Sequence, residues 1–178
     1  MWPRDRFSRL AGRLRPSPDE SAQAAVAILV RPTHDDLEFF LVKRAEVPGD
    51  PWSGDMAFPG GKKTPGDRSL LDTTVREVRE ETGIDLNGFR AAGFMEPLLS
   101  SVRRTLCVQP VIYRLDEVPE VHLNYELTKY MWVPLTTLRG SRAQAVVKGW
   151  EEPVFRVGCD VVWGLTYRML EKILELLD

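Results

Sequence analysis

Short apolar runs separated by polar stretches dominate the first third of the chain, and they predict strands. Ala24 to Val30 is one such run, and Phe39 to Val42 is a second with aromatic and β-branched side chains. The polar stretch 33–36 between them favours a hairpin turn. A loop rich in proline and glycine over 48–54 then leads to a brief strand at 56–58.

A helix follows this loop. Ser69 and Asp72 form a Ser-x-x-Asp phrase, which is a plausible start signal for a helix. Gly83 supplies a stop, because a glycine can take the left-handed conformation that closes many helices. The pattern therefore predicts a helix between Ser69 and Gly83.

Beyond Gly83 the pattern returns to strands and ends in a helix. The predicted strands are Phe89 to Met95, Leu106 to Arg114 and Leu127 to Val133, with a weaker hairpin over Val154 to Val162 that turns at 158–160. The last run carries its apolar side chains at a period of 3.6 residues, which predicts an amphipathic helix packed on the sheet. These side chains are Leu165, Met169, Ile173, Leu176 and Leu177. This order of elements predicts an α+β fold with a mixed sheet between helices.

Length and composition narrow the class of protein. A chain of 178 residues with 43% hydrophobic and 28% charged residues fits one globular domain with a sizeable core. A net charge of −2 argues against a nucleic-acid partner, and no apolar stretch is long enough for a membrane span. Cys107 and Cys159 lack metal or redox spacing, so we expect reduced thiols in the core of a cytoplasmic protein.

The first 20 residues differ from the rest, because they carry many arginines and few acids. Arginines occupy positions 4, 6, 9, 13 and 15, opposite Asp5, before the break at Pro16 and Pro18. One interpretation is an organelle transit peptide, and the other is a short basic helix or arm packed outside the domain. We expect an arm over 1–20 and a single domain over 21–178.

Three glutamates share one face of the central helix. Successive helical residues turn by about 100°, so Glu77, Glu80 and Glu81 lie within one sector, away from the apolar stripe that would pack on the sheet. Arg76 and Arg79 can offset their mutual repulsion as surface ion pairs. Taken alone, such a face is most often simply solvated.

The glycine loop upstream changes this interpretation. Gly60 and Gly61 permit close approach of a ligand to the backbone, and Pro59 fixes the entry to the loop. Backbone oxygens together with carboxylates are the ligands that Mg²⁺ or Mn²⁺ prefers. Together the two features predict a divalent cation holding a pyrophosphate.

These residues resemble the Nudix hydrolases, whose box is written G-x5-E-x7-R-E-U-x-E-E-x-G-U. Gly61 and the run Arg76 to Ile84 match the box. In the first half, Asp67 stands six residues after Gly61 where the box has glutamate, and eight residues separate it from Arg76. Asp67 can be read as a metal ligand or as a helix N-cap or turn residue.

The longer, Asp-bearing box is similar to that of the coenzyme A pyrophosphatase branch. Further phrases extend the resemblance over roughly residues 22–178, including Phe40 to Arg44, Gly54 to Ala57 and Val162 to Thr166. One departure concerns the substrate, because that branch has an arginine at the place of Asp50. The resemblance implies an α/β/α sandwich and the hydrolysis of a nucleoside diphosphate linked to another moiety.

The resemblance also implies roles for individual residues. Glu77, Glu80 and Glu81, with the Gly60 carbonyl, would hold Mg²⁺ or Mn²⁺, and Arg76 would orient the glutamates. The general base is either a glutamate of the box or Glu126, which matches the glutamate of a later strand phrase. Glu126 is equally readable as an exposed strand residue.

Recognition of the rest of the substrate is harder to assign. Arg44, Trp52, Arg103 and Arg104 are candidate substrate-binding residues, with Trp52 able to stack on a base. Coenzyme A or its thioesters are the first candidates. The alternatives are ADP-ribose, NADH, dinucleoside polyphosphates or nucleoside triphosphates, or a non-catalytic nucleotide-binding module. A monomer and a homodimer are both compatible with the sequence.

Overall fold

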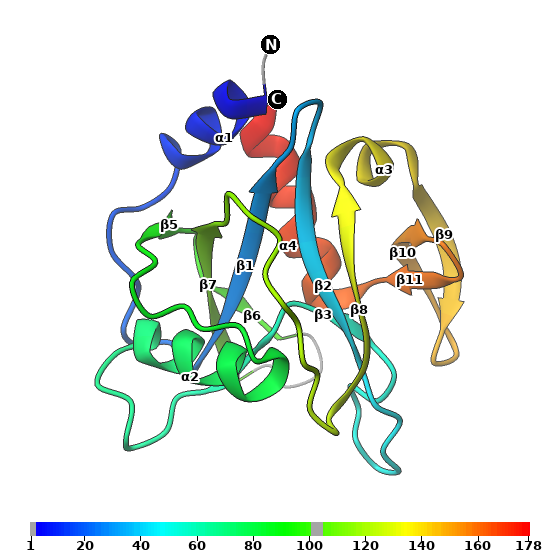
Figure 1. Cartoon of the computed structure of the whole chain (residues 1–178). Helices are drawn as coiled ribbons and strands as arrows, with labels where there is room; N and C mark the ends of the chain where they lie inside the picture. The colour runs from blue at the N-terminus through cyan, green and yellow to red at the C-terminus, as the bar shows by residue number, and fades with distance from the viewer. Residues whose placement is uncertain (1–2, 101–104) are drawn as a thin grey trace.

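A twisted mixed sheet runs through the centre of the computed structural model, which describes residues 3–100 and 105–178 (Figure 1). In the described residues this sheet has the strand order β3-β2-β1-β7-β5, while β4 pairs with β1, β6 with β7 and β8 with β2. Its strands are β1 (Ala24–Pro32), β2 (Leu37–Arg44), β3 (Met56–Ala57), β4 (Gly60–Lys62), β5 (Ala91–Phe94), β6 (Leu98–Leu99), β7 (Cys107–Arg114) and β8 (Leu127–Pro134).

The pairing confirms the predicted hairpin and makes the sheet mixed. β1 and β2 pair antiparallel, with Val30 opposite Phe39, around the polar turn. β7 then lies parallel to β1, whereas the other ladders of this sheet are antiparallel. The parallel pair is possible because a long connection, including a helix, separates the two strands in the chain.

Both faces of β1 are buried, which explains why this segment reads as a continuous apolar run rather than an alternating one. Ile28 and Val30 belong to the core cluster that contains the last helix, while Ala27 and Leu29 belong to the cluster beneath the central helix. The predicted sandwich of helices around a mixed sheet is confirmed.

The central helix is α2 (Leu70–Thr82), and its ends are those that the sequence predicts. The hydroxyl of Ser69 accepts a hydrogen bond from the amide of Asp72, which satisfies one of the free amides of the first turn. Gly83 has φ of +73° and its amide donates to Arg79 O. Val78 is fully buried against the sheet, so the helix presents its acidic face elsewhere.

The last helix, α4 (Gly164–Leu177), covers the opposite face and packs against α1 (Pro3–Ala11) (Figure 1). Two arginines of the basic start donate to the free carbonyls at the end of α4. Arg9 donates to Leu177 O at 3.2 Å, and Arg13 donates to Leu176 O at 2.6 Å. These contacts place positive charge where the dipole of α4 is negative.

A smaller sheet beside β8 was only partly predicted. It contains β9 (Arg142–Val147), β10 (Trp150–Val157) and β11 (Asp160–Val162) in the order β11-β10-β9. The hairpin between β10 and β11 confirms the expected turn at 158–160. The sequence pattern did not predict β9 or the short helix α3 (Leu135–Gly140), because β9 has no fully buried side chain and α3 is too short to show a period.

Candidate functional site

The acidic face of α2 lies against the glycine loop, where β4 pairs with β1. Glu81 is 4% exposed, and its Oε2 accepts a hydrogen bond from the amide of Gly60 at 3.0 Å. Glu77 is also largely covered, whereas the side chain of Glu80 is 57% exposed. The helix therefore directs one carboxylate into the protein, one along the loop and one toward solvent.

Close contacts explain why both positions of the loop, 60 and 61, are glycines. A Cβ at Gly60 would lie 2.3 Å from Ala25 O and 2.6 Å from Val26 Cα, and its φ is +153°. A Cβ at Gly61 would lie 2.4 Å from Oε1 of Glu77. Gly60 lets the loop pack on β1, and Gly61 lets the carboxylate of α2 reach the backbone.

Burial and like charges shift the titration of these acids. Burial raises the pKa of Glu81 to about 8, with further upward contributions from Glu77 and Glu126. Burial also raises the pKa of Glu77, although the Arg76 guanidinium opposes that shift and Glu80 and Glu126 reinforce it. Glu77 and Glu81 are therefore repelled by each other or by neighbouring carboxylates in their charged forms.

Arg76 connects the acids to the loop. Its guanidinium donates to Glu77 Oε1 at 2.8 Å, to Glu80 Oε2 at 3.3 Å and to Lys62 O at 3.1 Å. It also binds both oxygens of Asp67, at 3.0 and 2.9 Å. Arg76 therefore joins two of the three glutamates to the backbone of the glycine loop and to Asp67.

Asp67 is buried and fully engaged by donors of the protein. Besides Arg76, it accepts hydrogen bonds from the amide of Thr64 and the hydroxyl of Thr73. These partners hold the pKa of Asp67 below its usual range, with the Arg76 hydrogen bonds as the largest cause. The N-cap of α2 is Ser69 and not Asp67. Asp67 is a turn residue, and its carboxylate joins the turn at 64–67 to Arg76.

The donor set of this face suits a divalent cation. Carboxylates of Glu77 and Glu81 lie against the glycine loop and Glu80 lies on the same helix face, so a bound cation would relieve the repulsion on Glu77 and Glu81. No group of three His, Cys, Asp or Glu side chains in the described parts of the chain is arranged around one point as a metal site. In this conformation Glu77 is turned to Arg76 and Glu81 to the Gly60 amide.

Glu126 lies in an exposed turn just before β8, beside the end of β2. Its backbone carbonyl accepts a hydrogen bond from the amide of Ala45 at 2.7 Å. Its carboxylate contributes to the raised pKa values of Glu77 and Glu81. The amide of Asn124 donates to Glu81 O at 3.0 Å, so the turn that carries Glu126 lies against the end of α2, about 45 residues earlier in the chain.

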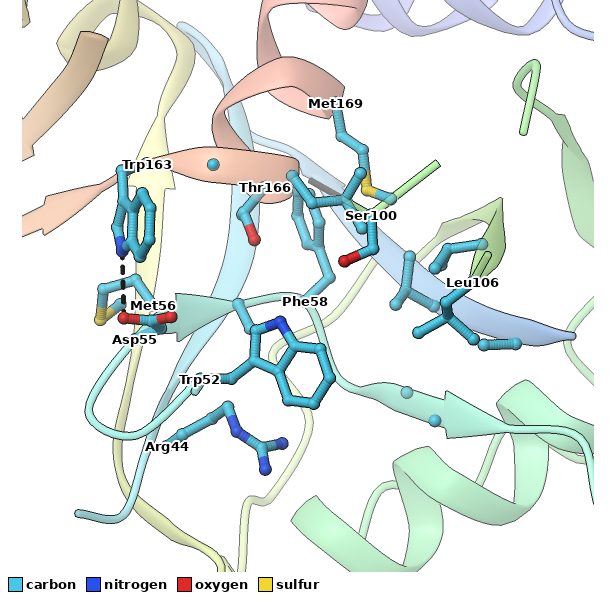
Figure 2. Close-up of a pocket in the computed structure, with 18 of the residues that line it drawn as sticks. Arg44, Trp52, Asp55, Met56, Phe58, Ser100, Leu106, Trp163, Thr166 and Met169 are labelled. Carbon is cyan, nitrogen blue, oxygen red and sulfur yellow. Dashed lines mark hydrogen bonds between the residues drawn. The ribbon is translucent and has the colours of Figure 1, made fainter. Parts of the chain in front are cut away.

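A cavity of about 290 Å³ opens beside the glycine loop and continues toward α4 (Figure 2). Its volume is close to the lower end of the range for small-molecule sites. Apolar side chains form most of its wall, including Phe58, Leu106 and Met169, while Ser100 and Thr166 add hydroxyls. Gly60 and Gly61 line it as well, so the cavity and the acidic face share the glycine loop.

Two of the predicted substrate-binding residues line this cavity. Trp52 and Arg44 both line it, and both are labelled in Figure 2. Asp50 pairs with Arg44 at 3.1 Å and accepts a hydrogen bond from the amide of Trp52 at 3.0 Å. Those two contacts, the amide first, hold the pKa of Asp50 below its usual value. The other two candidates, Arg103 and Arg104, lie outside the described residues.

The sequence did not predict where Trp163 and Cys159 lie. Trp163 lines the cavity, and its indole N–H donates to Asp55 at 3.0 Å (Figure 2). The Val162 to Thr166 phrase was the one signal that this segment matters. Cys159 was expected in the core, but it is exposed, and both Cys107 and Cys159 are free thiols.

Comparison with known proteins gives a family match and a set of distant relatives. Residues 21–153 match the NUDIX domain. A NudL protein of Yersinia enterocolitica, described as an uncharacterized Nudix hydrolase, is 29% identical over 69% of this chain and 66% of its own length. The mitochondrial coenzyme A diphosphatase NUDT8 of Mus musculus is 27% identical over 98% of this chain and 85% of that protein.

Coverage differs among these relatives. The NUDT8 protein of Homo sapiens is 31% identical over 70% of this chain, which spans only 56% of that relative.

Among the described residues, no helix combines the length and apolar content that crossing a membrane requires.

Solved structures support the fold alone. A MutT/nudix family protein from Enterococcus faecalis has a TM-score of 0.59 and 17% identity, over 96% of this chain and 68% of its own. The NUDIX domain of NrtR from Shewanella oneidensis, crystallised with ADP ribose, has a TM-score of 0.55 and 18% identity, over 88% of both chains.

Proposed function

The chain belongs to the NUDIX family, and from this premise we propose that it is a pyrophosphohydrolase. Its substrate is a nucleoside diphosphate linked to another moiety, with coenzyme A or its thioesters as the first candidate. The reaction cleaves the phosphoanhydride bond with water.

One observation carries this proposal. The cavity and the acidic face meet at Gly60 and Gly61. A substrate with its diphosphate over the glycine loop can therefore place one flanking group in the cavity. The reacting phosphorus then lies next to the carboxylates of α2.

Glu77, Glu80, Glu81 and the carbonyl of Gly60 would hold Mg²⁺ or Mn²⁺ in this proposal. When bound, such an ion neutralises charge on the diphosphate oxygens. Arg76 keeps two of the carboxylates oriented through its contacts with Glu77 and Glu80. Asp67 in turn fixes Arg76 from the opposite side.

The chain's own acids also supply the proton transfer. Water forms a bond to one phosphorus, its proton passes to a carboxylate, and the anhydride oxygen leaves with the bonding electron pair. Glu126 is our candidate for that base, because its exposed carboxylate lies near the acidic face and forms no ion pair within the described residues, where Asn124 donates to it at 3.5 Å. A glutamate of α2 is the alternative.

Recognition involves Arg44 and Trp52 at the cavity edge. Arg44 can contact a phosphate there, and Trp52 can stack on a planar group. Asp50 competes for Arg44, so the affinity for an additional phosphate at this edge is lowered. The similarity to two coenzyme A diphosphatases favours coenzyme A, whereas Asp50 favours a less highly charged relative of it.

The test is a product assay over coenzyme A, dephospho-coenzyme A, ADP-ribose, NADH, dinucleoside polyphosphates and nucleoside triphosphates. Each is incubated with Mg²⁺, with Mn²⁺ and with EDTA, and products are separated by chromatography. We expect metal-dependent cleavage within the diphosphate and the highest kcat/KM for coenzyme A or its dephosphorylated form. If none is cleaved although nucleotides bind, the chain is a nucleotide-binding module instead.

Asp50→Asn is the matched probe of substrate choice. Removing this charge frees Arg44, so the KM of coenzyme A should fall relative to that of dephospho-coenzyme A. An unchanged ratio of the two KM values would show that Asp50 does not affect the choice between these two substrates.

A further inference from the structure

The loop between β2 and β3, residues 45–55, contributes Trp52 and Asp55 to the wall of the cavity. Its internal hydrogen bonds, such as Val47 N to Ser53 Oγ at 2.8 Å and Gly54 N to Ala45 O at 3.4 Å, join loop residues to one another and not to the rest of the protein. A loop of this kind needs outside contacts to keep one shape.

One side chain of the smaller sheet supplies such contacts. The ammonium of Lys148, at the tip of the hairpin between β9 and β10, donates to Pro51 O at 2.6 Å. It also pairs with Asp55 at 2.8 Å and lies 5.2 Å from the centre of the Trp163 ring. The same Asp55 oxygen accepts the indole N–H of Trp163. Lys148 thus contacts both ends of the segment 51–55.

The backbone of Lys148 gives an independent sign that this position serves the loop. Lys148 has φ of +50°, and among the described residues it alone combines a side chain with positive φ. It precedes Gly149, with φ of +89°, in a two-residue turn between the paired residues Val147 and Trp150. Such turns favour asparagine or glycine, and lysine is strained there. Local strain of this kind is retained where a side chain has a task.

We propose that Lys148 is a positioning residue that clamps the loop 45–55 onto Trp163 and thereby shapes the substrate cavity. The smaller sheet is then a working part of the substrate site. The role in turnover rests on the proposed function, whereas the clamp itself does not. Lys148 contacts no reacting group, so its loss should affect binding rather than chemistry.

Lys148→Asn is the decisive variant. Asparagine is favoured at this turn position, so the melting temperature should stay unchanged or rise. The clamp is lost, so hydrogen exchange of a peptide covering 45–55 should accelerate about threefold or more, because the amides there open more often. KM for the best substrate should rise about fivefold with kcat within about twofold, because uniform binding is lost.

Two further variants frame this result. Lys148→Arg keeps the charge and the donors, and it should restore slow exchange at least in part. Lys172→Met removes an exposed lysine of α4 and should change none of the three readouts. If exchange over 45–55 and KM are both unchanged in Lys148→Asn, the proposal is wrong. It is also wrong if exchange rises equally throughout the protein together with a lower melting temperature.

The exchange measurement separates this proposal from the proposed function. If the wild-type protein cleaves no nucleotide but Lys148→Asn still loosens 45–55, the clamp stands and the enzymatic role fails. If the protein is active but the loop is insensitive to residue 148, the clamp fails and the enzymatic role stands.

Discussion

Replacing Asp67 with asparagine tests the link between the glycine loop and α2. The carboxylate accepts four hydrogen bonds, from Thr64 N at 2.9 Å, Thr73 Oγ1 at 3.1 Å and two nitrogens of Arg76 at 3.0 and 2.9 Å. An asparagine keeps one acceptor oxygen and turns an NH₂ group toward donors, so about two of these bonds are lost. At about 1–1.5 kcal/mol per buried bond, the free energy of unfolding should fall by about 2–3 kcal/mol.

The assay is urea unfolding followed by tryptophan fluorescence. Asp35→Asn is the matched control, because this side chain is 90% exposed, and its unfolding free energy should stay within about 0.5 kcal/mol of wild type. The difference between wild type and Asp67→Asn should also depend on pH. The pKa of Asp67 is lowered in the folded state, so its contribution is complete above the unfolded-state pKa of 3.8 and declines as pH falls below that value.

Two results would refute this reasoning. One is a loss below about 0.5 kcal/mol at pH 7, which would mean that Arg76 holds the turn without Asp67. The other is a gap between wild type and Asp67→Asn that stays constant from pH 7 to about pH 3 while both proteins remain folded.

Three further predictions concern the glycine loop, the end of α4 and the acidic face of α2. Gly61→Ala should lower the unfolding free energy by about 1–3 kcal/mol and reduce turnover, because its Cβ would lie 2.4 Å from a carboxylate oxygen of α2. Arg9→Ala combined with Arg13→Ala should lower it by about 1 kcal/mol at low salt, because the end of α4 loses two positive donors. Glu80→Gln should reduce kcat on the order of 100-fold with little change in melting temperature, because its carboxylate is mostly exposed.

Each of these predictions has its own check. Gly140→Ala is the control for Gly61→Ala, because a Cβ at Gly140 would meet no atom within 4 Å. This variant should leave stability and turnover unchanged. The arginine pair should lose its effect at high salt, and a loss that persists there would contradict the dipole argument. For Glu80→Gln, unchanged turnover with a lower melting temperature would indicate a structural role for the acidic face.

The sequence alone was enough to predict the helix and the hairpin that position the site. The caps at Ser69 and Gly83, the hairpin between β1 and β2 and the shared face of three glutamates depend on backbone geometry within a few residues. Such geometry is the same wherever the segment lies in the fold. The sequence could therefore determine these features without any knowledge of the sheet order.

The contacts that join the elements were decided by the tertiary structure. Asp67 meets Arg76 across a turn, and Lys148 reaches Asp55 from the hairpin of a second sheet, far along the chain. Trp163 likewise enters the cavity because β11, which leads into α4, contacts β3. No local period encodes such pairs, because side-chain proximity between elements depends on which strands are neighbours and on how the helices pack on them.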